Sequence, residues 1–148
     1  MSKLTIATSD IDRAGTDAEV EVIFGGNDGW HATYPQTLDN PGDDFERGSI
    51  GVYDVNLCYM TDVKSIIIDL SDSGYGPDWH IAWIRLEDSD SGLDVYSDVN
   101  HWLEAGYYHY FSFKPTSQAW SNNIVIPQEV LERTPRLATS RRKIAPTS

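Results

Sequence analysis

Short segments with a hydrophobic period of two fill the first 113 residues and limit what this chain can fold into. In residues 20–24, valine and phenylalanine alternate with glutamate and isoleucine, and residues 52–57 and 79–86 alternate in the same way. A period of two sends successive side chains to opposite faces of a β-strand. Together with further extended segments, the predicted strands cover residues 20–24, 52–57, 63–70, 79–86, 93–99 and 107–113.

Clusters of turn-forming residues separate these segments, and no long helical period occurs before residue 114. Examples are Asn40-Pro41-Gly42 and Ser73-Gly74-Tyr75-Gly76-Pro77. Glycine, proline and asparagine favour turns for distinct backbone reasons. Seven or eight strands in about 110 residues, without helices between them, predict an antiparallel β-sandwich. Trp79 and Trp83 stand four residues apart, so we predict that both lie on one strand face in the core.

Charge divides the chain at about the same place. Residues 1–113 hold 21 acidic and 5 basic side chains, whereas residues 114–148 hold 2 acidic and 6 basic ones. We therefore predict a sandwich over residues 1–114 and a C-terminal extension over residues 115–148 that is largely irregular or mobile, because it has few large apolar side chains to bury. The net charge of −12 argues against nucleic-acid binding, which requires a basic surface.

Several classes of protein are disfavoured by what the sequence lacks. No apolar run reaches the length of a membrane span, and no leader is visible at the start, so the cytoplasm is the default location, with peripheral membrane or cell-surface attachment left open. The one cysteine, Cys58, excludes an intramolecular disulfide and a cysteine zinc site. We predict Cys58 as a small core residue in a strand. Because neither His-Glu-x-x-His nor Gly-x-Ser-x-Gly occurs, we do not expect an enzyme.

Acidic residues gather in loops rather than on strands. Neighbouring carboxylates repel one another unless a cation neutralises them, and Ca²⁺ prefers carboxylate, amide and carbonyl oxygens. The simpler alternative is a soluble acidic surface. The loop acids, together with the amide side chain of Asn40, form three groups. They are Asp10, Asp12 and Asp17; Asp39, Asn40, Asp43, Asp44 and Glu46; and Asp72 and Asp78.

Three blocks in these loops and strands resemble the PLAT/LH2 domain family. Ala14-Gly15-Thr16-Asp17-Ala18 is similar to the Gly-Thr-Asp-Ala signature that opens the family. Residues 38–48 resemble its second block, and Ile66–Leu70 with Gly76-Pro77-Asp78-Trp79 resemble its third. The resemblance extends from about Leu4 to Phe113. It implies an eight-stranded sandwich of two four-stranded sheets, in agreement with the strand pattern.

The resemblance also implies a calcium site at one end of the sandwich. Matched to the family's motifs, backbone carbonyls and side-chain oxygens would come from Gly15, Thr16, Asn40, Asp43, Asp44 and Asp78. This chain has Arg13 where related calcium-binding members carry an acid, and Asp12 is the candidate to replace it. Asp17 has two readings, as a metal ligand or as a side chain that bonds its own loop.

The family's usual role implies docking to a membrane or lipid surface, or to a membrane-associated protein. Bound calcium would neutralise the acidic loops, and aromatic side chains would then enter the interface. The candidates are Tyr75, near Asp78, together with Trp30 and Tyr34 if their loop lies at that end. Two alternatives stay open, a calcium-stabilised protein-interaction module and a sugar-binding sandwich that uses Trp30, Tyr34 or Trp102.

Overall fold

A computed structural model describes residues 2–26, 33–39, 45–72 and 78–116. The chain divides into two compact units, Met1–Phe113 and Lys114–Ser148. Five predicted site residues lie outside the described residues, and so does all of the predicted extension after Thr116. Those site residues are Trp30, Asn40, Asp43, Asp44 and Tyr75.

Ten β-strands occur in the described part of the chain. They are β1 (Ser2–Thr8), β2 (Val20–Gly26), β3 (Gln36–Thr37), β4 (Ile50–Val55), β5 (Val63–Leu70), β6 (Trp79–Asp88), β7 (Leu93–Ser97), β8 (His101–Leu103), β9 (Tyr108–Ser112) and β10 (Lys114–Pro115). The sequence pattern located β2, β4, β5, β6, β7 and β9, but not β1 or the short strands. In these residues no helix has the length and apolar character needed to cross a bilayer.

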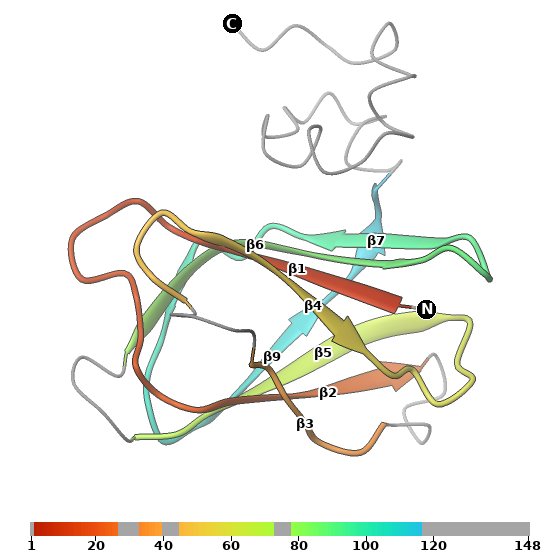
Figure 1. Ribbon diagram of the computed structural model, residues 1–148, viewed down its shortest axis with the longest axis horizontal. Helices are drawn as coiled ribbons and strands as arrows, with labels where there is room; N and C mark the ends of the chain where they lie inside the picture. The colour runs from red at the N-terminus through yellow and green to blue at the C-terminus, as the bar shows by residue number, and fades with distance from the viewer. Residues whose placement is uncertain (1, 27–32, 40–44, 73–77, 117–148) are drawn as a thin grey trace, which may run out of the picture. The chain divides into compact units, whose positions relative to one another are not determined.

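Within Met1–Phe113 the strands form two antiparallel sheets that pack face to face (Figure 1). One sheet has the order β7-β6-β1-β4, and β8 also pairs with β6. The other has the order β3-β2-β5-β9. This arrangement confirms the predicted all-β antiparallel sandwich. The strand count differs from the predicted four in each sheet because β8, with 3 residues, adds to the first sheet.

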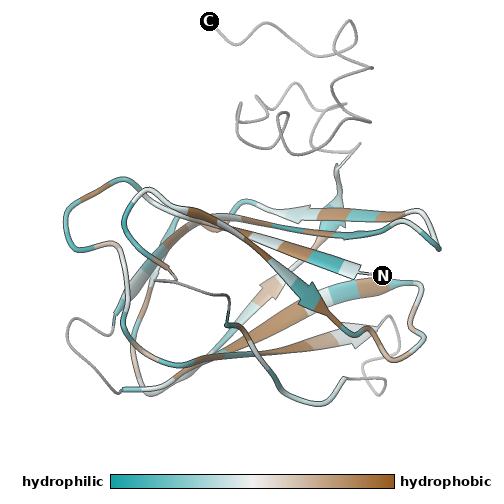
Figure 2. Cartoon of the chain, viewed as in Figure 1, coloured by the Kyte–Doolittle hydropathy of each residue, from teal (hydrophilic) through white to brown (hydrophobic). Residues whose placement is uncertain are grey.

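Apolar side chains from both sheets fill the space between them. Phe24 of β2 and Ile66 and Ile68 of β5 are fully buried, and they meet Ile81 and Leu86 of β6 in one cluster. Figure 2 shows the long hydrophobic stretches on these strands and mostly hydrophilic residues in the loops at both ends. Burial of this apolar area is the main favourable term in folding.

Trp79 and Trp83 do not share a face, which corrects one prediction. The pairing of β1 with β6 shifts between Ala7, opposite Trp83, and Thr8, opposite Ile81. This irregularity inserts one residue into β6 and reverses the alternation beyond it. Trp79 therefore lies in the core cluster, whereas Trp83 is buried outside that cluster, beside Tyr96 of β7.

Cys58 is not in a strand, which corrects a second prediction. β4 ends at Val55, and Cys58 has a φ of 52°, a left-handed conformation that strands do not use. The side chain is half-buried rather than enclosed in the core.

Candidate metal site at one end of the sandwich

The loop after β1 and the loop before β4 are bonded together at one end of the sandwich. The amide of Thr16 donates to the carbonyl of Phe45 at 3.0 Å, and the amide of Gly48 donates to the carbonyl of Ser9 at 3.1 Å. The start of β6 joins them, because the amide of His80 donates to the carbonyl of Ala14 at 2.9 Å. Segments that are distant in the sequence therefore form one frame.

Gly15 lies at the closest approach of these two loops. A Cβ atom at this position would lie 2.8 Å from the carbonyl oxygen of Phe45 and 2.9 Å from the amide nitrogen of Arg47. Both neighbours are backbone atoms, so the contact cannot be relieved by a side-chain rotation. Glycine is therefore required here by space.

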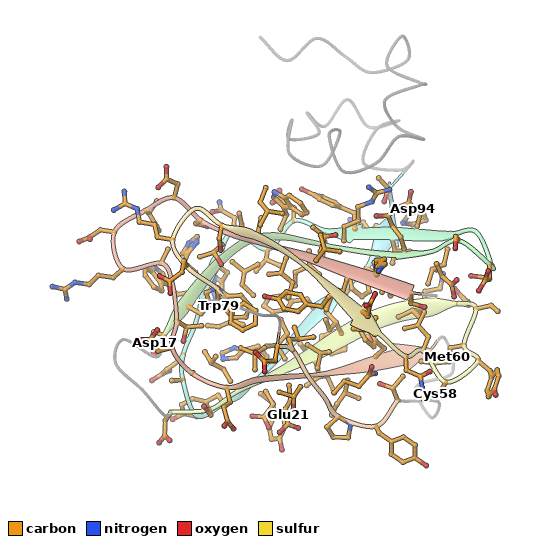
Figure 3. All side chains as sticks on the ribbon, viewed as in Figure 1. Asp17, Glu21, Cys58, Met60, Trp79 and Asp94 are labelled. Atoms are coloured by element: carbon orange, nitrogen blue, oxygen red, sulfur yellow. The ribbon has the colours of Figure 1, made fainter. Side chains whose placement is uncertain are left out.

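A recess of about 320 Å³ opens between these loops and is lined by acidic side chains. Thr16 and Asp17, two predicted site residues, line it, and no basic side chain lines it among the described residues. Figure 3 shows Asp17 at this end, with Trp79 nearby. The carboxylates of the recess belong to Asp17, Glu19, Asp39 and Glu46.

The sequence analysis named Asp17 as a candidate ligand and counted Asp39 and Glu46 among the clustered loop acids, but it did not include Asp39, Glu46 or Glu19 in the ligand set. Glu19 was predicted as part of an alternating strand. Its amide donates a hydrogen bond to the hydroxyl of Ser71 at 2.9 Å. Asp39 and Glu46 flank the segment 40–44, which carries Asn40, Asp43 and Asp44. Their position on either side of the predicted ligands was the available signal.

Thr16 contributes to the loop through its side chain. Its hydroxyl accepts a hydrogen bond from the amide of Ala18 at 3.1 Å, and the residue is buried. Asp17, by contrast, is exposed. The hydroxyl of Thr16 thus fixes the turn that presents the carboxylate of Asp17.

Asp78 and Asp12 are not among the described residues that line the recess. Oδ1 of Asp78 accepts a hydrogen bond from the amide of Ala105 at 2.9 Å, and Asp78 does not line the recess. Asp12 is exposed in the turn closed by the bond from the amide of Ala14 to the carbonyl of Ile11. The next residue, Arg13, has a φ of 62°. Of the described predicted site residues, Thr16 and Asp17 line the recess, whereas Gly15, Asp12 and Asp78 do not.

Two further groups tune the charge of this end. Arg47 Nε lies 3.0 Å from Oδ1 of Asp10, and both side chains are exposed, so the pair contributes little to stability. His80 is buried, and its Nδ1 lies 2.6 Å from the hydroxyl of Ser9. Burial, with a smaller effect of His101, lowers the pKa of His80, which favours the neutral ring at this end.

Tyr34 follows β2 at the end of the sandwich opposite the recess, so the condition attached to its predicted membrane contact, a loop at the acidic end, is not met by its position. β2 starts next to the recess at Val20 and carries the chain across the sheet before Tyr34 follows (Figure 1). Tyr34 lines a separate recess with Cys58 and Tyr59. A strand of 7 residues spans about 23 Å, which explains the separation.

The described residues do not by themselves make a complete cation site. No group of three or more histidine, cysteine, aspartate or glutamate side chains is close enough to hold a metal ion within the described ranges. Their donors are carboxylate and carbonyl oxygens, which suit Ca²⁺ better than softer metals. A complete site at this end would need oxygens from the segment 40–44 as well.

Comparison with known proteins agrees with the fold. The sequence profile of the PLAT/LH2 domain matches residues 3–114. The chain is 30% identical over 101 residues to lipoxygenase homology domain-containing protein 1 of Mus musculus. The matched region covers 68% of this chain and 5% of that protein. It is also 30% identical over 105 residues to phospholipase C of Clostridium haemolyticum. This matched region covers 68% of this chain and 26% of that enzyme. The chain thus spans a small part of each relative.

Two solved structures share the fold. A coral 8R-lipoxygenase, described as activated by calcium through a C2-like domain, superposes with a TM-score of 0.68 and 22% identity, over 89% of this chain and 20% of the enzyme. An 11R-lipoxygenase described as calcium-dependent superposes with a TM-score of 0.57 and 27% identity, over 76% of this chain and 17% of the enzyme.

Proposed function

The chain belongs to the PLAT/LH2 domain family, and from this membership and the acidic recess we propose that residues 1–114 form a calcium-binding module that docks to a membrane or lipid surface. The observation that carries the proposal is the recess itself, whose described lining includes four carboxylates and no basic side chain. Oxygens from the neighbouring segment 40–44 would complete a calcium site there, because Ca²⁺ takes six to eight oxygen ligands.

Oxygen atoms from two loops would hold the ion. Asp17 offers a carboxylate beside the carbonyls of Gly15 and Thr16. The segment that carries Asn40, Asp43 and Asp44 starts after Asp39 and ends before Phe45, and both of these residues line the recess. When bound, calcium supplies the positive charge that attracts an anionic headgroup. Asp78 accepts a hydrogen bond from the amide of Ala105 through Oδ1, and its second carboxylate oxygen stays a predicted ligand.

Electrostatics makes docking conditional on calcium. Residues 1–113 carry 21 acidic and 5 basic side chains, so an anionic leaflet at about −30 mV repels them. Charges more than about 8 Å apart are screened at physiological salt, so one or two ions decide the interaction at the docking end. Tyr75, three residues before Asp78, is the aromatic residue that we propose to enter the interface.

The module is accessory rather than catalytic in this proposal. The enzymes that share its fold are several times longer than this chain, which covers 17% to 20% of the two lipoxygenases. We expect a membrane or a membrane-associated protein as the partner. We assign no catalytic activity to the module itself.

Calcium is expected to stabilise the folded chain. For a Kd near 10 µM, 1 mM calcium amounts to about 100 times Kd and adds about 2.7 kcal/mol to the free energy of unfolding. The melting temperature should rise by several degrees relative to a sample in EDTA. Asp17→Asn combined with Asp39→Asn should abolish this rise, because both carboxylates line the recess. Differential scanning calorimetry measures both effects.

The matched control is Asp62→Asn. It removes one exposed carboxylate, 3.1 Å from Lys64 Nζ, in the connection between β4 and β5. This variant should keep the full calcium-dependent rise. An equal melting temperature in calcium and EDTA for the unmodified chain would contradict the calcium part of the proposal.

Vesicle binding tests docking separately. In co-sedimentation with vesicles of phosphatidylserine and phosphatidylcholine, the chain should pellet in 1 mM calcium and stay in the supernatant in EDTA. Tyr75→Ala should reduce the pelleted fraction but leave the calcium-dependent rise in melting temperature unchanged, because it removes interface area and no ligand. Calcium stabilisation without vesicle binding would instead favour a protein-interaction module.

A further inference from the structure

The β3-β2-β5-β9 sheet has an outer face, on the side away from the core, that carries both acidic and apolar side chains. Phe24 of β2 and Ile68 of β5 lie in the core cluster, and Phe111 of β9 packs against it. Their neighbours along each strand therefore point to the opposite face. Figure 3 shows one of them, Glu21, pointing away from the space between the two sheets. The residues of the outer face that matter here are Glu21, Ile23, Ile67, Asp69, Tyr108 and Tyr110.

Strand pairing places two carboxylates side by side on the outer face. Glu21 of β2 lies opposite Asp69 of β5, and Tyr108 of β9 lies opposite Asp69 on its other side. These three residues form the acidic row. Side chains opposite each other in an antiparallel pair have Cβ atoms about 4.5–5.5 Å apart. One guanidinium or ammonium group can therefore reach both carboxylates, with the ring of Tyr108 beside it.

The two carboxylates of the acidic row have no cationic partner in the described part of the chain. There, neither Glu21 nor Asp69 takes part in an ion pair or a hydrogen bond through its side chain. Like charges directly opposite each other destabilise a sheet. A positive group supplied from outside would therefore relieve a repulsion that the isolated sheet retains.

An apolar row lies next to the acidic row, two residues further along each strand. Ile23 lies opposite Ile67, and Ile67 lies opposite Tyr110. Tyr110 is 64% exposed, and both isoleucines are half-buried. Two residues of an antiparallel strand span about 6.8 Å, which is therefore the distance between the acidic row and the apolar row.

We propose that the outer face binds a short extended segment of a protein partner, in which one residue separates a basic residue from a large apolar residue. The basic side chain bonds the two carboxylates of the acidic row and lies against the ring of Tyr108. The apolar side chain covers the apolar row. In an extended segment, residues i and i+2 point the same way at a separation of about 6.6–6.8 Å, which matches the distance between the rows.

Other occupants fit the outer face less well. A second copy would bring its own acidic row against the first. A stable interface also uses about 20–30 residues from each partner, many more than the two rows provide. An anionic membrane would be repelled by the same carboxylates. Residues 1–113 carry 21 acidic and 5 basic side chains, a charge that attracts a basic segment from a distance.

A symmetric peptide tests the spacing directly. In acetyl-Leu-Ser-Arg-Ser-Leu-amide, each leucine is two residues from arginine, so the peptide fits in either direction. The control acetyl-Ser-Leu-Arg-Leu-Ser-amide has the same composition and charge but places leucine next to arginine. Each peptide is titrated into the isotopically labelled chain in EDTA and followed by NMR. The first should shift the amide signals of Ile23, Ile67 and Tyr110 in a saturable way, with a Kd about fivefold or more below that of the control.

The decisive variant is Glu21→Gln combined with Asp69→Asn. It removes the like-charge pair with little change in shape, so the melting temperature in EDTA should stay the same or rise. Affinity for the first peptide should nevertheless fall about tenfold. The matched control is Asp10→Asn combined with Asp54→Asn, which removes the same charge from exposed positions outside the outer face. It should keep the affinity within about twofold, because salt screens distant charges.

EDTA removes calcium, so these results do not depend on the function proposed for the acidic end. Five results would overturn the proposal of a peptide site. They are no saturable shift at 10 mM peptide, equal affinity for the two peptides, full affinity in the Glu21→Gln and Asp69→Asn variant, the same shifts when the chain alone is concentrated, and the same shifts with phosphatidylcholine vesicles or maltotriose in place of peptide.

Discussion

Replacing Asp94 with alanine is expected to lower the free energy of unfolding by about 3 kcal/mol. Arg85 of β6 is 1% exposed, and its Nε and Nη2 donate to Asp94 Oδ1 at 2.9 Å and Oδ2 at 2.6 Å. Loss of one partner leaves a buried charge uncompensated, which typically costs about 3–5 kcal/mol. The lower value applies because Glu87 remains 3.3 Å from Nη2. Urea denaturation followed by tryptophan fluorescence measures the change.

The matched control removes both charges. Arg85→Met combined with Asp94→Leu should restore stability to within about 1 kcal/mol of the unmodified chain, because an apolar pair needs no compensation. Arg85 Nη1 supports this expectation, since it is buried without a hydrogen-bond partner among the described residues. If Asp94→Ala costs less than about 1 kcal/mol, the buried charge of Arg85 is not left uncompensated by the loss of Asp94.

The architecture was predictable because its main signal is local. A period of two and turn clusters located six of the strands, and these include the central pair β2 and β5. The face on which Trp83 lies was not predictable, because the shift opposite Ala7 and Thr8 depends on pairing with a strand more than 70 residues away. Sequence periodicity contains no information about such a bulge until the partner strand is known.

The candidate sites divide in the same way. Gly15, Thr16 and Asp17 form one contiguous motif, whereas Asp39 and Glu46 join Asp17 at the recess only through the fold. The turn at Cys58 was missed because Leu57-Cys58-Tyr59-Met60 contains neither glycine nor asparagine at its centre. Its conformation is imposed by Asn56 and by Gln36, which is 20 residues away. Strained turns of this kind contradict local propensity.

Trp79→Ala is expected to cost about 3–5 kcal/mol, the usual range for removing a fully buried tryptophan. Trp79 is 0% exposed, and its ring lies 4.7 Å from the ring of Phe45, centroid to centroid. Its Nε1 donates to the hydroxyl of Thr8 at 2.9 Å, and Thr8 is buried as well. Truncation therefore leaves a cavity and an unsatisfied hydroxyl together. Urea denaturation in EDTA measures this loss without a contribution from calcium.

Trp79→Phe separates the ring contact from the hydrogen bond. This variant keeps an aromatic ring beside Phe45 and should cost only about 1–3 kcal/mol, chiefly for the unsatisfied hydroxyl of Thr8. Phe45 directly follows the segment that carries Asn40, Asp43 and Asp44, and its carbonyl accepts from the amide of Thr16. Calcium titration calorimetry at a temperature where both variants are folded should therefore show weaker binding for Trp79→Ala than for Trp79→Phe. Equal calcium affinities would mean that the core tryptophan stabilises the sandwich without organising the acidic end.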